Sequence, residues 1–365
     1  MDFKLSEEQQ LIKQSMEEVA SGSEKTDSHE LLKNLADMGF IGIFYPEAVG
    51  GSDSDFMSFA VNVETLAKVS ASHALALTIQ GIQIAYPLFK WGSDAIQSAY
   101  LQLVNSGEKT GAYAYSEQGL GEDQLEINAT AEHHEGLYVI NGSKSFVLNA
   151  EHSDFFIVFA CTGDLLSAFV IDRDAQGITI DPPYRKMGLD GLSAATVHFK
   201  NVSVPETHLL GHEGDGEAIF GQTNELLNIG LAATSIGLSQ KAEEKSIAYG
   251  KQRFQFGRPV IAFEALQEKI GKMSVNIEAA RLLMYKAAAD VDNGASFTES
   301  SSVARYFALE TGIVNCREAI QVHGGYGYTR DLGIEVLYRD MQGLMAVESQ
   351  NKPLIFTIAA KVIEA

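Results

Sequence analysis

Apolar residues recur every three or four positions along the first part of the chain, which is the spacing of one face of a helix. Ser6 and Gln9 form a capping-box pair, and Ile12, Met16 and Val19 follow at helical spacing. The same pattern predicts further helices over residues 29–38, 55–70 and 93–105, with the glycine-rich turn YPEAVGGSDSD between the first two. We therefore predict an N-terminal α-helical domain over residues 1–110, and no pattern within it indicates chemistry.

From about Gly111 to Gly211 the apolar pattern alternates with a period of two, which is typical of half-buried strands. The stretches that carry it are GLYVINGSKSFVL, DFFIVFACTGDLLSAFVIDRD and AATVHFKNVSVP. In the first of them, Asn141-Gly142 lies between two alternating runs, and both residues tolerate positive φ, so this pair predicts a tight hairpin turn. The segment predicts a compact β domain over residues 111–212, a small barrel or sandwich.

After Gly216 the helical period returns and the predicted helices become long. Three apolar stripes follow one another: Leu226, Ile229, Ala233 and Ile236; then Leu266, Ile270, Met273, Ile277 and Met284; then Val303, Phe307 and Val314. The tail from Pro353 to Ala365 predicts a fourth helix. Four helices with apolar seams favour an antiparallel four-helix bundle over residues 213–365.

Composition narrows the classes of protein that remain. The chain has 365 residues, 45% of them hydrophobic, and a formal net charge of −21, which argues against broad contact with nucleic acid or an anionic membrane. We see no apolar run long enough to span a bilayer and no secretion signal, so we expect a cytoplasmic protein. Cys161 and Cys316 lie far apart without metal-binding spacing, and we interpret both as core thiols.

Three polar stretches each allow a structural and a functional interpretation. In QVHGGYGYTRD, Gly324 and Gly325 fit a helix end, or a backbone that a flat or pyrophosphate-bearing ligand approaches closely. In KQRFQFGRPV, Arg253 and Arg258 fit a polar loop, or a site for a phosphate beside a ring. YAYSEQGLGED, with Ser116, fits a turn or a ligand contact. The fingerprint GxGxxG is absent, so no Rossmann nucleotide site is implied.

A single carboxylate in GLMAVESQNKPL raises a similar choice. Glu348 follows Met345, Ala346 and Val347, and it is either an ordinary solvated side chain or a base held in a dry place. Apolar neighbours disfavour the charged form of a carboxylate and so raise its pKa toward working pH. That property suits a base that must remove a proton from carbon.

Taken in order, YAYSE, NGSKSFVLN, RFQFGRP, QVHGGYGY and LYRD followed by Glu348 resemble the acyl-CoA dehydrogenase family from end to end. The resemblance implies an α domain, a β barrel and a four-helix bundle, assembled as a homotetramer built from two dimers. It also implies FAD between the β domain and the bundle, with the adenine half held by a neighbouring subunit.

Residue by residue, the resemblance assigns two groups of cofactor contacts. Around the flavin ring and the thioester these are Tyr113, Tyr115, Ser116, Phe146 and Leu148; toward the rest of FAD they are Arg253, Gln255, Phe256, Gln267, Gln321, Gly325 and Gln350. Glu348 matches the catalytic base of the majority subfamily, and the position of the base in a minority subfamily falls on Leu227. Glu122 and Asn228 match positions on the substrate side, where many members carry a serine and an arginine.

Four functional hypotheses follow. The first is an acyl-CoA dehydrogenase that forms a trans-2-enoyl thioester and passes electrons to an electron-transfer flavoprotein. The second has the same chemistry on an acyl group carried by a carrier protein. The third is an oxygenase-like member of the same fold, because fold does not fix chemistry. The fourth is a subunit that binds an acyl thioester without turnover; Glu348 argues against it, whereas ESQN, in place of the usual Glu-Gly-Thr-Ser, argues for it.

Overall fold

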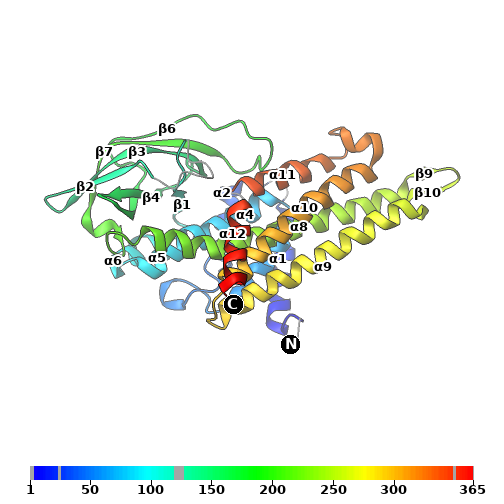
Figure 1. Cartoon of the computed structure of the whole chain (residues 1–365), viewed down its shortest axis with the longest axis horizontal. Helices are drawn as coiled ribbons and strands as arrows, with labels where there is room; N and C mark the ends of the chain where they lie inside the picture. Colours follow the sequence, from blue (N-terminus) through cyan, green and yellow to red (C-terminus); the bar gives the residue numbers. More distant parts are fainter. Residues whose placement is uncertain (1–3, 24–25, 119–126, 348–350, 365) are drawn as a thin grey trace.

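The structure is a computed structural model that describes residues 4–23, 26–118, 127–347 and 351–364. Two helical segments enclose a β-sheet in sequence, and in space the sheet lies at one end of the molecule while three long helices extend toward the other (Figure 1). A helical N-terminal part, a central sheet and a helical C-terminal part were predicted from the sequence, and this order is confirmed.

The regular elements described in the N-terminal segment are all helical, and loops join them. Its elements are α1 (Glu7–Gly22), α2 (Ser28–Asp37), the 3-10 turn η1 (Glu47–Val49), α3 (Phe56–Ala67), α4 (Ala71–Thr78), the π-helical η2 (Ile79–Ile84), α5 (Ala85–Trp91), α6 (Asp94–Ile96), η3 (Gln97–Leu101) and α7 (Gln102–Asn105). The capping box at Ser6 and Gln9 is present. Residues 71–88 were not predicted as helix, because almost every one of them is buried and an all-round apolar helix has no polar face to give a period.

The central segment forms one eight-stranded sheet. Its strands are β1 (Gly111–Ala114), β2 (Thr130–His134), β3 (Leu137–Leu148), β4 (Phe155–Thr162), β5 (Leu165–Asp172), β6 (Ile178–Ile180), β7 (Ala194–Pro205) and β8 (Leu209–Leu210). The order is β6-β7-β3-β2-β4-β5-β8, and β1 pairs in parallel with β4. Alternate residues of β1 face different cores, so Ala112 and Ala114 pack inside the sheet domain while Tyr113 packs among the helices.

The predicted hairpin at Asn141-Gly142 is wrong. Both residues lie inside β3, and the turn between β2 and β3 is at Glu135 and Gly136, with φ of 48° and 83°. Gly142 instead marks an irregularity in the pairing of β3 with β7, and a Cβ there would lie 2.7 Å from the Cβ of Ala129. The glycine is needed for a bulge and a close approach, two uses that the Asn-Gly pattern shares with turns.

The C-terminal segment contains α8 (Gly216–Gln252), α9 (Glu264–Asp292), α10 (Thr298–Val322), α11 (Ile334–Ala346) and α12 (Asn351–Glu364). A two-stranded hairpin of β9 (Phe254–Gln255) and β10 (Arg258–Pro259) joins α8 to the short η5 (Val260–Ala262) and α9, and η6 (Gly324–Tyr328) joins α10 toward α11. The hairpin lies at the end of the bundle away from the sheet (Figure 1).

The predicted stripe of α8 is fully buried, and Met273, Ile277 and Met284 of the α9 stripe are buried too. The stripe predicted for α10 is on the wrong face, because its members are only half-buried. The buried face of α10 consists mainly of small residues: Ala304, Ala308, Gly312, Cys316 and Ala319. Close packing requires them, since a Cβ at Gly312 would lie 2.4 Å from Ser235 Oγ.

Cys316 is buried and Cys161 is half-buried, and neither forms a disulfide. Within the described ranges, no group of three or more His, Cys, Asp or Glu side chains is arranged to hold a metal ion. In the same ranges, each helix is too short or too polar to cross a bilayer.

Candidate active site

One cavity, of about 540 Å³, lies between the sheet and α11, and we call it the sheet–helix cavity. Its lining consists of Ser116, Phe146, Leu148, residues 184–189, Gln342, Gly343, Ala346 and Val347. Three of the residues predicted to surround a flavin ring are therefore brought together here. The opposite wall is the end of α11, directly before Glu348 in the sequence.

Phe146 projects into this cavity because the strand that carries it is irregular. Its φ is 53°, and the pairing of β3 with β7 shifts register between Lys144 and Val147. A left-handed conformation is costly for a phenylalanine and marks a position that its surroundings hold in place. The ring is 61% exposed and stacks on Tyr184 with centroids 4.3 Å apart, so it presents an open aromatic surface to a flat ligand.

A buried ion pair supports this wall from behind. Lys144 is 0% exposed, and its Nζ donates to Glu117 Oε1 at 2.7 Å and to the carbonyl oxygen of Tyr115 at 3.0 Å. The Glu117 carboxylate also accepts from the backbone N–H groups of Asn128 and Ala129. Burial alone raises the pKa of Glu117, but Lys144 and these hydrogen bonds outweigh burial and hold the pKa below its usual value.

A loop between β6 and β7 closes the cavity by docking on α11. The Leu189 N–H donates to Asp340 Oδ1 at 2.7 Å, and Arg339 Nη1 donates to the Met187 carbonyl oxygen at 2.6 Å. A Cβ at Gly188 would lie 2.4 Å from the Arg339 carbonyl oxygen, so only glycine permits this approach. Burial raises the pKa of Asp340, although the hydrogen bond from Leu189 opposes the shift.

Arg305 on α10 reaches the same end of α11 from the bundle. Its side chain is 0% exposed; Nη1 donates to Asn228 Oδ1 on α8 at 3.0 Å, and Nη2 donates to the Val347 carbonyl oxygen at 2.8 Å. The resemblance to the family suggested a role on the substrate side for Asn228, at a position where many members carry an arginine. Asn228 is buried and holds an arginine that comes from another helix.

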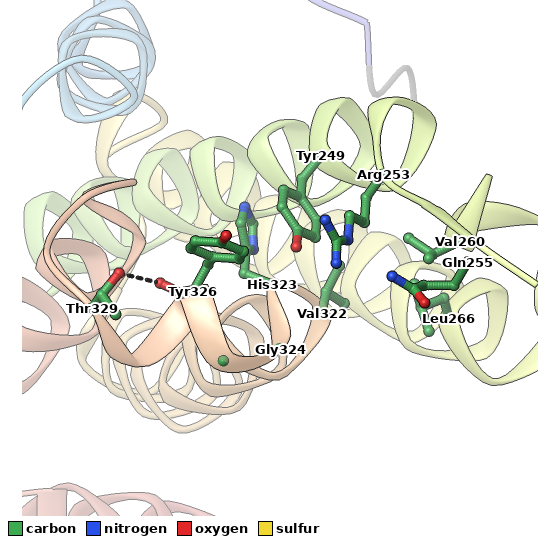
Figure 2. Close-up of a pocket in the computed structure, with 11 residues that line it drawn as sticks. Tyr249, Arg253, Gln255, Val260, Leu266, Val322, His323, Gly324, Tyr326 and Thr329 are labelled. Atoms are coloured by element: carbon green, nitrogen blue, oxygen red, sulfur yellow. Dashed lines mark hydrogen bonds between the residues drawn. The ribbon is translucent and has the colours of Figure 1, made fainter.

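A second cavity, of about 470 Å³, lies at the far end of the bundle, and we call it the bundle-end cavity (Figure 2). Arg253, Gln255 and Gly325 line it together with aromatic residues, and a Cβ at Gly324 or Gly325 would meet nothing within 4 Å. His323 stacks on Tyr249 with ring centroids 4.5 Å apart. Burial lowers the pKa of His323, so the ring stays neutral at pH 7.

The other predicted contacts that fall on described residues do not line either cavity. Tyr113 is buried beside Phe159, and Tyr115 stacks on Phe220 of α8 at 3.7 Å. Phe256 is 92% exposed at the hairpin tip. Gln267 and Gln321 are exposed on α9 and α10. Glu122, Glu348 and Gln350 lie outside the described residues, so their predicted roles stay predictions.

Sequence reasoning missed Lys144, Glu117, Arg305 and the loop at residues 184–189. The signal for Arg305 was a lone arginine among small residues in SSSVARYFAL, at a position on the buried face of a helix. The signal for Lys144 was a charged residue in an otherwise alternating strand. Pairing partners from distant segments cannot be assigned by such patterns alone.

The chain thus combines a helical N-terminal part, a central sheet and a C-terminal helical bundle, with one cavity between the sheet and α11 and another at the far end of the bundle. Family models for the acyl-CoA dehydrogenase N-terminal, middle and C-terminal domains match residues 6–108, 112–202 and 215–362. The chain belongs to the acyl-CoA dehydrogenase family.

Relatives and solved structures cover nearly the whole chain. A 3-(aryl)acrylate reductase of Clostridium sporogenes is 33% identical over 359 residues, covering 96% of this chain and 95% of the relative. An acyl-CoA dehydrogenase of Bacillus subtilis is 34% identical, with 90% and 89% covered. The caffeyl-CoA reductase-Etf complex subunit CarC of Acetobacterium woodii is 31% identical, with 98% and 95% covered.

Among solved structures, butyryl-CoA dehydrogenase from Megasphaera elsdenii superposes with a TM-score of 0.95 at 30% identity, covering 100% of both chains. The FAD complex of PigA superposes with a TM-score of 0.94 at 28% identity, covering 99% of both chains.

Proposed function

We propose that this chain is an FAD-dependent acyl-CoA dehydrogenase that converts an acyl thioester to the trans-2-enoyl thioester, with Glu348 as the base for the α-proton. The observation that carries the proposal is the sheet–helix cavity: its β wall presents Ser116, Phe146 and Leu148, and its opposite wall ends at Val347, one residue before Glu348.

The residues present fit FAD. The exposed Phe146 ring offers a face to a flat ring system, and Ser116 and the backbone around it offer hydrogen-bonding groups. At the other end of the bundle, open glycines, Arg253 and Gln255 suit a pyrophosphate and an adenosine. When bound, FAD supplies the acceptor for the hydride that leaves the β carbon.

Ser116, Phe146 and Leu148 of the first group line one cavity, and Arg253, Gln255 and Gly325 of the second group line the other. No described residue lines both cavities, which supports a cofactor shared between two copies of the chain. We propose a homotetramer built from two dimers. Apolar side chains left exposed on the bundle support further contacts between copies: Val275 and Leu282 on α9 and Phe356 on α12. Val303, Phe307 and Val314 on α10 are only half-buried, so they too could contact another copy of the chain.

Met345, Ala346 and Val347 supply an apolar approach to the proposed base, of which Ala346 and Val347 line the cavity. Dry surroundings raise the pKa of a carboxylate and strengthen it as a base toward an α-proton. Arg185 and Lys186 add positive charge to the same cavity in a protein of net charge −21. These cations suit the phosphates of coenzyme A or of the cofactor.

We propose an electron-transfer flavoprotein as the electron acceptor. Support comes from a relative that is named as a subunit of a complex with Etf. Two relatives are named as reductases, a 3-(aryl)acrylate reductase and a subunit of a caffeyl-CoA reductase complex. Their names favour a second candidate function, in which the same site catalyses the reverse reaction and reduces an enoyl thioester. The residue that removes the α-proton in one direction returns it in the other, so both candidates use Glu348.

The test is Glu348→Gln, assayed by anaerobic mixing of the flavin-loaded protein with butyryl-CoA, 2-methylbutyryl-CoA and phenylpropionyl-CoA. Glutamine keeps the shape of the side chain but cannot accept the proton, so we expect the rate of flavin bleaching to fall about a hundredfold to ten-thousandfold. FAD content and acyl-CoA affinity should stay close to those of the parent. Glu264→Gln, an exposed change on α9, is the matched control.

Flavin reduction by Glu348→Gln at close to the parental rate contradicts the proposal and leaves the oxygenase-like hypothesis. A parent that binds FAD but reacts with none of the acyl-CoAs points to a carrier-protein substrate or to a subunit without turnover. If cinnamoyl-CoA oxidises the reduced flavin faster than phenylpropionyl-CoA reduces the oxidised flavin, the result favours the enoyl reductase direction.

A further inference from the structure

His323 is the C-cap residue of α10, and its side chain lines the bundle-end cavity (Figure 2). The residue is 4% exposed. Its Nδ1 lies 2.7 Å from the carbonyl oxygen of Ala319, one turn earlier in the same helix. A carbonyl oxygen can only accept a hydrogen bond, so Nδ1 carries the proton and donates. Carbonyl groups at the C-terminal end of a helix carry a partial negative charge, which favours a side-chain donor at this place.

The hydrogen bond at Nδ1 makes the other ring nitrogen, Nε2, an acceptor. A neutral imidazole has one N–H and one lone pair, and burial lowers the pKa of His323, so the ring is neutral at pH 7. Stacking on Tyr249, with the ring planes 28° apart, restrains the orientation of the imidazole. Within the described ranges Nε2 has no hydrogen-bond partner. A nearly buried acceptor without a partner costs free energy until a ligand or a water molecule supplies a donor.

The other residues of the cavity indicate which kind of donor belongs beside His323. Val260, Leu266 and Tyr326 give the cavity an apolar and aromatic lining, and Arg253 gives it a cation. A lone pair repels phosphate oxygens, so phosphates are favoured near Arg253 and disfavoured beside Nε2. The apolar lining favours a flat ring over a sugar. The ligand group at Nε2 is therefore a donor on an aromatic ring, and the exocyclic amino group of adenine is such a donor.

We propose that His323 is a specificity-determining residue of the bundle-end cavity, where its Nε2 accepts a hydrogen bond from the exocyclic amino group of the adenine of FAD. The proposal rests on the proposed function, in which this cavity receives the adenine half of a cofactor shared between two copies. Arg253 and the open glycines suit the phosphates of any dinucleotide, whereas the lone pair of His323 selects among bases. A base with a carbonyl oxygen at the same place would set two acceptors against each other.

The first measurement compares FAD with its hypoxanthine analogue, in which a carbonyl oxygen replaces the amino group. Each ligand is titrated at pH 7, by flavin fluorescence, into the apoprotein of the parent and of His323→Phe. We expect the parent to bind FAD about tenfold to a hundredfold more tightly than the analogue. Phenylalanine keeps a flat ring against Tyr249 but has no lone pair, so His323→Phe should bind the two ligands with affinities within about twofold of each other.

The second measurement separates the base from the sugar. The ligand is an FAD analogue whose adenosine lacks the ribose 2′-hydroxyl, titrated into the same two proteins. We expect the parent and His323→Phe to lose the same factor in affinity with this analogue, because the hydroxyl does not contact His323. A loss confined to the parent overturns the proposal, since Nε2 would then accept from the ribose and not from the base.

His73→Phe is the matched control. His73 is also 4% exposed, and its Nε2 donates to a backbone carbonyl oxygen, that of Thr26, at 3.1 Å. It lies on α4 and lines neither cavity. We expect His73→Phe to keep the parental ratio of affinities for FAD and the hypoxanthine analogue.

The ratio of the two affinities distinguishes recognition of the base from a structural role. If His323 only supports the end of α10, His323→Phe lowers both affinities equally and keeps the parental ratio, and this result overturns the inference. The parental comparison decides even where a variant fails to fold, because equal binding of FAD and the hypoxanthine analogue by the parent also overturns the inference while the proposed function stands. A parent that binds neither ligand contradicts the proposed function and the inference with it.

Discussion

At the scale of single residues, a buried ion pair lies behind the wall of the sheet–helix cavity that contains Phe146 and Ser116. The Ser145 N–H donates to the Ser116 carbonyl oxygen at 2.8 Å, and the neighbouring Lys144 spans to Glu117 on the same segment. A buried pair of this kind contributes little over apolar packing, but removing one member leaves an uncompensated charge. Its value lies in fixing two segments that a ligand must contact together.

Glu117→Gln should therefore destabilise the protein by about 3–5 kcal/mol at pH 7, because the buried ammonium of Lys144 loses the carboxylate charge that it contacts at 2.7 Å. The pKa of Glu117 lies below its usual value in the folded protein, so its contribution is present above the pKa of the unfolded chain and is lost as pH falls through the folded pKa. Urea unfolding at pH 7 and pH 3 should show a smaller acid-induced loss in the variant than in the parent.

The double variant Glu117→Gln with Lys144→Met is the control, since it removes both charges and should recover most of the lost stability. A loss below about 1 kcal/mol in Glu117→Gln would show that the pair is solvated in solution.

At the scale of elements, the cavity depends on a loop pressed against one helix. Residues 187–189 lie on α11 so closely that Gly188 faces backbone, and Leu189 has a left-handed φ of 55° and packs against Gly343. Asp340 accepts the Leu189 N–H and so fixes the loop to the helix that leads to Val347. The β domain and the bundle are thereby joined beside the proposed base.

Asp340→Asn tests this joint. Asparagine keeps an oxygen that accepts from Leu189, whereas burial raises the pKa of Asp340, so the folded protein favours the protonated acid. A raised pKa means that the stability contributed by Asp340 falls as pH rises from the unfolded value through the folded one. The stability of Asp340→Asn relative to the parent should therefore improve from pH 4 to pH 7 in urea unfolding.

Asp340→Leu, which leaves the Leu189 N–H without its acceptor, should instead cost about 1–3 kcal/mol at either pH. Equal stability of the leucine and asparagine variants would show that the hydrogen bond between Asp340 and Leu189 does not contribute to stability.

Many of the helices and strands could be predicted from the sequence. The capping box at Ser6, the α8 stripe and the change from period 3.6 to period 2 each follow from a pattern in neighbouring residues, and the structure confirms them. Asn141-Gly142 misled because glycine is favoured both in tight turns and at strand irregularities where another backbone approaches closely, here that of Ala129. The α10 stripe misled because close helix packing selects small residues over large apolar ones. Contacts such as that of Arg305 with Val347 join distant segments and have no local rule.

At the scale of the whole molecule, the two cavities lie at separate places on one bundle, because one is lined by residues of the sheet domain and α11 and the other by residues beside the β9–β10 hairpin. Under the proposed sharing, the bundle-end residues of one copy complete the site of another. Cofactor affinity and assembly are then thermodynamically linked, since each stabilises the other.

Arg253→Ala should lower FAD affinity about tenfold or more, because a hydrogen bond to a charged group is lost. Apoprotein stability should change by less than about 0.5 kcal/mol, since the side chain is exposed. Flavin titration by fluorescence and light scattering with and without FAD measure both quantities. Lys251→Ala, an exposed change one turn or less away, is the control. A fully flavin-loaded monomer would contradict the sharing.

The separation of the two cavities also bears on inheritance. Under the proposed sharing, a chain with a defect at Arg253 keeps an intact sheet–helix cavity, and the site that the defect damages is completed in a neighbouring copy. In a cell that makes both normal and altered chains, mixed assemblies would then lose activity in normal copies and regain it in altered ones. The effect of a change at the hairpin end of the bundle would therefore depend on the other copies in the assembly, whereas a change at Phe146 would affect the site of the chain that carries it.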